Sequence, residues 1–197
     1  MRKVYIIIFL ISLSSLIAWV FWAQQLKYLL PTPIPENYHK VSVYQHLNLS
    51  NISKDNKPLL LHFFNPDCPC SRFNLKHIRT LFLHHKNEVR FIAVIPFFAD
   101  LDKAKSMLEE EMEVIKDSET KELAVECGVY STPQAVIPTP DRNLYYRGNY
   151  NKARYCSRKE SSYAQIALND LLNNKPTPHF DGQATKSYGC SIYTKEK

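Results

Sequence analysis

The segment from residue 59 to 76, which reads LLLHFFNPDCPCSRFNLK, constrains the fold more than any other part of the chain. It opens with an apolar run at residues 59–64 that lacks proline and glycine, which is typical of a strand buried on both faces. An Asn-Pro-Asp turn ends the run, and from Phe73 onward apolar residues recur at helical spacing. Cys68 and Cys70 are therefore expected where a central strand turns into a helix.

This position favours reactive thiols. The first amides of a helix have no partners within the helix, and the helix dipole places partial positive charge there, so a thiolate is stabilised and its pKa falls. We expect Cys68 to be the nucleophile and Cys70 the resolving thiol. Pro69 suits the first helical position, where its missing N–H costs nothing. The alternative is that the two cysteines are buried or bind a metal.

Residues 1–28 are predicted to be a transmembrane anchor. Residues 4–23 carry no charge, and twenty helical residues span roughly the 30 Å of a bilayer's hydrocarbon core. Arg2 and Lys3 precede the run, so the N-terminus is expected in the cytoplasm and the remainder outside. A cleaved signal peptide is the competing interpretation, although its apolar region is usually shorter.

Composition points to an exported domain. Five cysteines in a chain of 197 residues indicate an oxidising compartment, so we expect a single-pass protein of a Gram-negative inner membrane with its domain in the periplasm. The net charge of +6 is spread along the chain without a dense basic run, which gives no reason to expect a nucleic-acid partner.

The rest of the chain predicts an α/β fold. Residues 29–57 form a proline-containing linker and pre-domain segment, and residues 58–174 form the domain. Helices are expected at residues 71–86, 100–112, 118–127 and 157–174, and further strands at 89–97, 114–115, 134–137 and 144–146. Strands that alternate with helices, followed by a hairpin and a closing helix, give a four- or five-stranded mixed sheet with helices on both faces. Residues 175–197 form a loop-like tail that contains Cys190.

With the strand, the Cys-Pro-Cys turn, the helix and a later Ser131-Thr132-Pro133, the chain resembles thioredoxin-fold proteins. The resemblance implies that Pro133 is cis and lies, with Thr132 before it, against the sulfurs of Cys68 and Cys70. It also implies a role for His62, which lies six residues before Cys68, where thioredoxins carry a buried acid that moves protons. The alternative for His62 is a core histidine that bonds to a backbone carbonyl.

The chain more closely resembles a membrane-anchored thioredoxin-like family of Gram-negative bacteria whose function is unknown. This resemblance is carried by the segment Pro-Asp-Cys-Pro-Cys-Ser-Arg-Phe-Asn, by Arg-Tyr-Cys at 154–156 and by the tail Gly189-Cys190-Ser191-Ile192. One departure from thioredoxins is that a single residue, Pro69, separates the cysteines. The smaller ring predicts a disulfide that is easier to reduce than that of thioredoxin.

The sequence also suggests roles for Arg72 and for the three cysteines outside the Cys-Pro-Cys motif. Arg72 is expected to support the thiolate by its positive charge, or else to be a solvated surface residue. Cys127 is expected to be a buried small residue. Cys156 and Cys190 are predicted to form a structural disulfide that flanks the last helix; the alternative is that Cys190 relays electrons to the Cys68–Cys70 pair.

The leading functional hypothesis is a thiol–disulfide oxidoreductase that needs no cofactor beyond a redox-active disulfide, with protein thiols or disulfides and an electron donor or oxidant protein as partners. The alternatives are a Cu(I)-binding metallochaperone-like module, because two close thiolates and a histidine suit a soft metal, and a non-catalytic protein on the same fold. No dedicated metal site is predicted.

Overall fold

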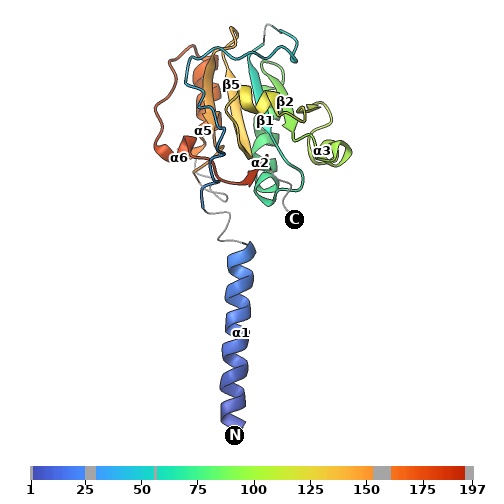
Figure 1. Ribbon diagram of the computed structural model, residues 1–197. Helices are drawn as coiled ribbons and strands as arrows, with labels where there is room; N and C mark the ends of the chain where they lie inside the picture. The colour runs from blue at the N-terminus through green and yellow to red at the C-terminus, as the bar shows by residue number, and fades with distance from the viewer. Residues whose placement is uncertain (1, 25–29, 56, 153–160, 194–197) are drawn as a thin grey trace.

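The computed structural model describes residues 2–24, 30–55, 57–152 and 161–193. Its first element is helix α1 (Arg2–Gln24), which contains the predicted apolar segment and lies outside the globular part of the fold (Figure 1). The stretch Arg2–Ala23 has a mean hydropathy of 2.5, and none of it is buried. The helix is therefore long and apolar enough to cross a membrane.

The globular part is built on one mixed sheet of five strands, in the order β3-β2-β1-β5-β6. Their bounds are β1 (Leu59–Phe63), β2 (Arg90–Ile95), β3 (Glu113–Lys116), β5 (Gln134–Pro138) and β6 (Leu144–Gly148). Strands β1, β2 and β3 run parallel, whereas β5 is antiparallel to both β1 and β6. Strand β1 is central, because Leu61 pairs with Ile92 on one side and with Val136 on the other.

Helices cover both faces of this sheet (Figure 1). Their bounds are α2 (Pro69–His85), α3 (Leu101–Met107), α4 (Glu122–Glu126), α5 (Tyr163–Leu172) and α6 (Gly182–Thr185). Leu60 packs with residues of α2 and α5, whereas Leu59, Leu61 and Phe63 pack with residues of α4. The alternation follows from the strand's period of two, and both faces are apolar because helices cover both. The strand order, the cis peptide described below and the two helical layers make this a thioredoxin-like fold, as the sequence predicted.

Residues 41–52, which lie in the predicted linker, pack against the sheet. Residues 41–52 consist of turns, irregular backbone and one isolated bridge, between His46 and Asn143. The side chains of Val41, Leu47, Leu49 and Ile52 are nevertheless buried in the core on the α4 side. Part of the predicted linker thus contributes to the hydrophobic core.

The tail is the main departure from the predicted secondary structure. Residues 175–197 were expected to be loop-like, but α6 and the short strand β7 (Cys190–Ser191) lie within them. Strand β7 pairs antiparallel with β4 (Ser131–Thr132), so that Thr132 is opposite Cys190. Local sequence did not reveal this pairing because each strand has only two residues and its partner is far away in the chain.

Candidate redox site

The site begins where β1 ends. The backbone turns through Asn65, whose side-chain oxygen accepts from the N–H of Asp67 at 3.0 Å and whose carbonyl accepts from the N–H of Cys68 at 3.0 Å. Cys68 is the N-cap of α2 with an extended backbone, and Pro69 occupies the first turn, as predicted. The turn therefore places the sulfur-bearing residues at the positive end of a helix of 17 residues.

Three sulfurs gather at this helix end. Cys68 is disulfide-bonded to Cys190, with a Cα–Cα distance of 5.9 Å across a sequence separation of 122 residues. The Sγ atoms of Cys68, Cys70 and Cys190 all lie within 4.8 Å of one another, and the three residues are 1, 6 and 1 % exposed. Cys70 is not part of the disulfide.

The disulfide expected between Cys156 and Cys190 is therefore wrong for this structure, because the sulfur of Cys190 is bonded to Cys68. Cys156 itself lies outside the described residues. The prediction failed because the cysteine pairing of a chain depends on its tertiary fold and cannot be deduced from spacing alone. The tail instead folds back to the start of α2, where Cys190 meets Cys68.

A cis peptide bond lies against the sulfurs. The bond between Thr132 and Pro133 is cis, as the resemblance to thioredoxins implied. The sulfur of Cys68 is 3.5 Å from the carbonyl oxygen of Thr132, and Thr132 is in turn paired with Cys190 across the β4–β7 ribbon. The segment before Pro133 thus contacts both halves of the disulfide.

The tail is held at the site by contacts on its other side as well. The hydroxyl of Thr32 donates to the carbonyl of Gly189 at 3.0 Å, and the N–H of Thr32 donates to the carbonyl of Ser187 at 2.9 Å. The buried side chain of Gln134 donates to the hydroxyl of Ser187. Gly189 has a φ of +137°, and a Cβ there would collide with the carbonyl of Thr132. Only glycine therefore fits immediately before Cys190 at this close approach.

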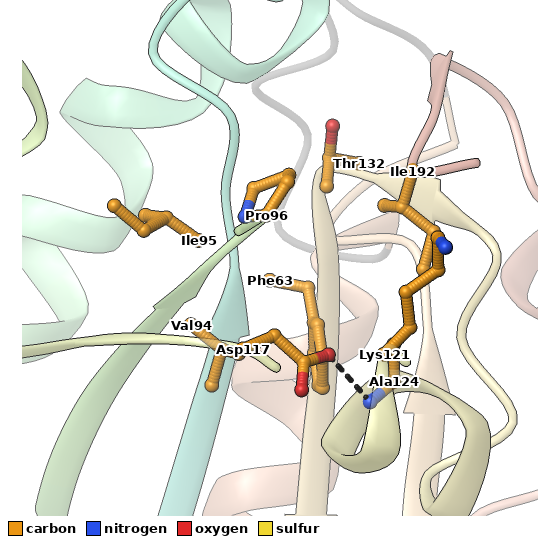
Figure 2. A pocket seen from close by; sticks show the side chains of 9 residues that line it. All are labelled: Phe63, Val94, Ile95, Pro96, Asp117, Lys121, Ala124, Thr132 and Ile192. Carbon is orange, nitrogen blue, oxygen red and sulfur yellow. Dashed lines mark hydrogen bonds between the residues drawn. The ribbon is translucent and has the colours of Figure 1, made fainter. Parts of the chain in front are cut away.

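After Cys190, the side chain of Ile192 is buried in the core on the α4 side, where it lines a small hollow (Figure 2). Lys121 lines the same hollow, and the N–H of Ile192 donates to the carbonyl of Tyr130 at 3.2 Å. Asp117 also lines this hollow; it is 7 % exposed and accepts from the N–H groups of Leu123 and Ala124, each at 3.0 Å. Helix α4 begins at Glu122 and not at Ser118. Lys121 is its N-cap residue with a left-handed backbone, while the hydroxyl of Ser118 and the carboxylate of Asp117 accept from the first N–H groups of the helix.

His62 is fully buried on β1, on the α2 side of the sheet. Its Nδ1 lies 2.7 Å from the hydroxyl of Tyr150, so its partner is a tyrosine and not a backbone carbonyl. Burial, with a smaller contribution from His77, lowers the pKa of His62 to about 3. The ring is therefore neutral at pH 7. Its Nε2 has no hydrogen-bond partner among the described residues. The proposed role of His62 in proton transfer stays a prediction.

The other predicted residues lie in different surroundings. Arg72 is exposed on α2, and its backbone N–H bonds to the carbonyl of Cys68 at 3.2 Å. Cys127 is fully buried in the core on the α4 side, as predicted, and burial raises the pKa of its thiol. The sequence reasoning underrated Gly189 and Ile192. No local pattern marks these two residues, because their roles depend on contacts with β4 and with the core on the α4 side.

Comparison with solved structures supports the fold. The chain is similar to a hypothetical protein, SMc02350, from Sinorhizobium meliloti 1021, with 16 % identity, a TM-score of 0.65, and coverage of 81 % of this chain and 98 % of that chain. An uncharacterized conserved protein from Geobacillus kaustophilus gives 20 % identity and a TM-score of 0.63, with coverage of 84 % and 100 %. At these identities the likeness concerns the fold alone.

A thioredoxin-like protein from Aeropyrum pernix also matches, with 14 % identity, a TM-score of 0.46, and coverage of 63 % of this chain and 80 % of that chain. No curated protein matches the chain. The family described as "Domain of unknown function (DUF6436)" matches residues 38–192, a range that includes the Cys-Pro-Cys turn, the cis proline and the docked tail. The chain belongs to this DUF6436 family.

Proposed function

We propose that the chain is a membrane-anchored thiol–disulfide oxidoreductase in which Cys68 is the exchanging sulfur. The observation that carries this proposal is the gathering of three buried cysteine sulfurs at the start of α2, next to the residue before cis-Pro133. A helix N-terminus stabilises the thiolate that attacks or leaves in each exchange step. Cys127, the other cysteine within the described residues, lies in a separate core cluster.

The proposed reaction has two steps. The thiolate of Cys68 attacks one sulfur of a substrate disulfide, which forms a mixed disulfide and releases the other substrate sulfur as a thiolate. Cys70 then attacks the Cys68 sulfur, which forms a Cys68–Cys70 bond and releases the second substrate thiolate. The same two steps in reverse oxidise a substrate dithiol to a disulfide. Electrons balance in both directions of the reaction, because one disulfide is consumed for each disulfide formed.

The membrane helix limits where this chemistry occurs. Helix α1 ends at Gln24, and Thr32 already contacts the tail beside Cys190. A chain of eight residues spans at most about 28 Å, so the sulfurs are tethered close to the end of α1. With Arg2 and Lys3 before α1, we place the N-terminus in the cytoplasm and the redox site on the periplasmic side of the inner membrane. Its redox partners are then proteins at or near that membrane surface.

The test is exchange with a disulfide-bonded protein such as insulin, with the full chain in detergent micelles or nanodiscs. We expect Cys68→Ser to abolish exchange. The double variant Cys70→Ser/Cys190→Ser should accumulate the mixed disulfide on Cys68, because it lacks both neighbouring thiols that could release the substrate. Cys127→Ser is the matched control, and we expect it to exchange at the wild-type rate. Exchange by Cys68→Ser at the wild-type rate would refute the proposal.

A second candidate function is Cu(I) binding. When reduced, the three sulfurs that lie within 4.8 Å of one another offer soft ligands of the type that Cu(I) prefers. The third ligand would be Cys190, whereas the sequence had suggested a histidine. Anaerobic Cu(I) titration of the reduced chain tests this alternative: one bound ion, lost in Cys190→Ser, would favour it, and no binding would exclude it.

A further inference from the structure

Cys190 is part of the redox centre by position, although it is far from the Cys-Pro-Cys motif in the chain. Its sulfur is bonded to Cys68, and both sulfurs lie within 4.8 Å of the Cys70 sulfur. Only one pair among three sulfurs can be joined at a time. The arrangement therefore permits two disulfides that share Cys68, one to the tail and one within the motif.

The tail is held well enough to return to the site but weakly enough to leave it. Its strand β7 has two residues, and it pairs with a two-residue partner, β4. Further contacts at the site are two hydrogen bonds from Thr32, one from Gln134 to Ser187, one from Ile192 to Tyr130, and an isolated bridge between Pro31 and Tyr188. Short pairing of this kind opens more readily than a core strand does.

We propose that Cys70 exchanges with Cys190 for the bond to Cys68, so that the tail strand vacates the β4 edge when the motif disulfide forms. This inference rests on the proposed function, because it requires Cys68 to exchange disulfides. The thiolate of Cys70 attacks the Cys68 sulfur, the Cys68–Cys70 bond forms, and the Cys68–Cys190 bond breaks. Cys190 leaves as a thiolate and takes up the proton that Cys70 gave to solvent. No outside oxidant or reductant is needed.

Once the tail has left, the free edge of β4 determines which kind of substrate segment can bind in its place. The backbone of β4 would pair with an extended segment, and the position of Cys190 would be taken by a substrate cysteine next to Cys68. The residue before that cysteine must approach the carbonyl of Thr132 as closely as Gly189 does. The buried position that Ile192 occupies in the core on the α4 side suits an aliphatic residue two positions after it. Substrates are thus extended segments in which glycine precedes the cysteine.

The test follows Cys190 in the full chain, oxidised to one disulfide in detergent micelles and then freed of reductant. Its alkylation by iodoacetamide is quenched with acid at intervals and mapped by mass spectrometry. We expect wild-type Cys190 to be alkylated while Cys68 becomes linked to Cys70. In Cys70→Ser we expect Cys190 to be alkylated at least about tenfold more slowly, because nothing displaces it. Cys127→Ser is the control and should label as the wild type does.

Two results would overturn the inference: alkylation of Cys190 at the same rate in Cys70→Ser and the wild type, or a wild-type chain that never contains a Cys68–Cys70 link. The second result needs no variant, so it stands even if Cys70→Ser folds poorly. Either result, combined with insulin exchange that still depends on Cys68, would remove the relay and leave the proposed function intact. Loss of Cys68-dependent exchange would remove the proposed function itself.

Discussion

The most discriminating perturbation of the docked tail is Gly189→Ala. Gly189 has a φ of +137°, and an added Cβ would meet the carbonyl of Thr132, a backbone atom that cannot rotate away as a flexible side chain could. A non-glycine residue in this backbone region costs about 1–3 kcal/mol before the collision is counted. We expect the substitution to weaken docking of the tail by at least about 2 kcal/mol, which corresponds to roughly thirtyfold in an equilibrium constant.

The assay is the equilibrium fraction of Cys68–Cys190 disulfide in a glutathione buffer of fixed composition, read by acid quenching and peptide mapping. Gly189→Ala should lower the equilibrium constant for this bond by about thirtyfold, while urea unfolding of the globular part changes little. Gly182→Ala is the matched control, because a Cβ at Gly182 meets nothing within 4 Å. If Gly189→Ala kept the wild-type constant, the close approach of the tail to Thr132 would be refuted.

Three further predictions concern the rest of the site and its support. Because the folded pKa of His62 is about 3 and the unfolded value is near 6.5, the contribution of this residue to stability is complete above pH 6.5 and is lost as the pH falls toward 3. The loss of stability should be about 2 kcal/mol at pH 5. In His62→Gln, unfolding free energies from urea titrations followed by far-UV circular dichroism should depend less on pH than in the wild type. An unchanged pH dependence would contradict the buried, neutral state of His62. Asp117→Ala should lower the free energy of unfolding by about 2 kcal/mol, because the backbone N–H groups of Ser118, Leu123 and Ala124 lose their acceptor. Asp100→Ala, which removes one exposed helix cap, should lower it less. Equal losses in urea unfolding would contradict this prediction. Native alkylation should leave Cys127 unmodified until urea is added, since the thiol is buried and burial raises its pKa, and rapid labelling without urea would be inconsistent with its position.

The central part of the fold could be predicted because its signals are local. The apolar run at residues 59–64 became β1, whose residues are all buried, and the Cys-Pro-Cys turn became the start of α2. Both follow from short patterns: continuous apolar residues for a doubly covered strand, and proline at the first helical turn. The cis peptide at Pro133 came from the resemblance to thioredoxins and not from any local pattern.

The tail and the disulfide could not be predicted because they depend on contacts between distant segments. Nothing in residues 187–192 alternates strongly enough to indicate a strand, and β7 exists only because β4 and Thr32 lie beside it. The start of α4 was misplaced for a related reason. The hydroxyl of Ser118 does accept from the N–H of Glu122, at 3.1 Å, but the helix starts only there, where the buried carboxylate of Asp117 binds the amides of Leu123 and Ala124. A long-range or buried partner overrode the local preference in each case.

The central claim is that the redox centre contains three cysteines, with Cys68 shared between two possible partners. Its most direct test is a disulfide map of the full chain, purified from membranes without reductant and alkylated in acid. The account predicts that every disulfide of Cys190 or Cys70 has Cys68 as its other half. A map that links Cys190 to Cys156 and leaves Cys68 as a thiol would contradict it.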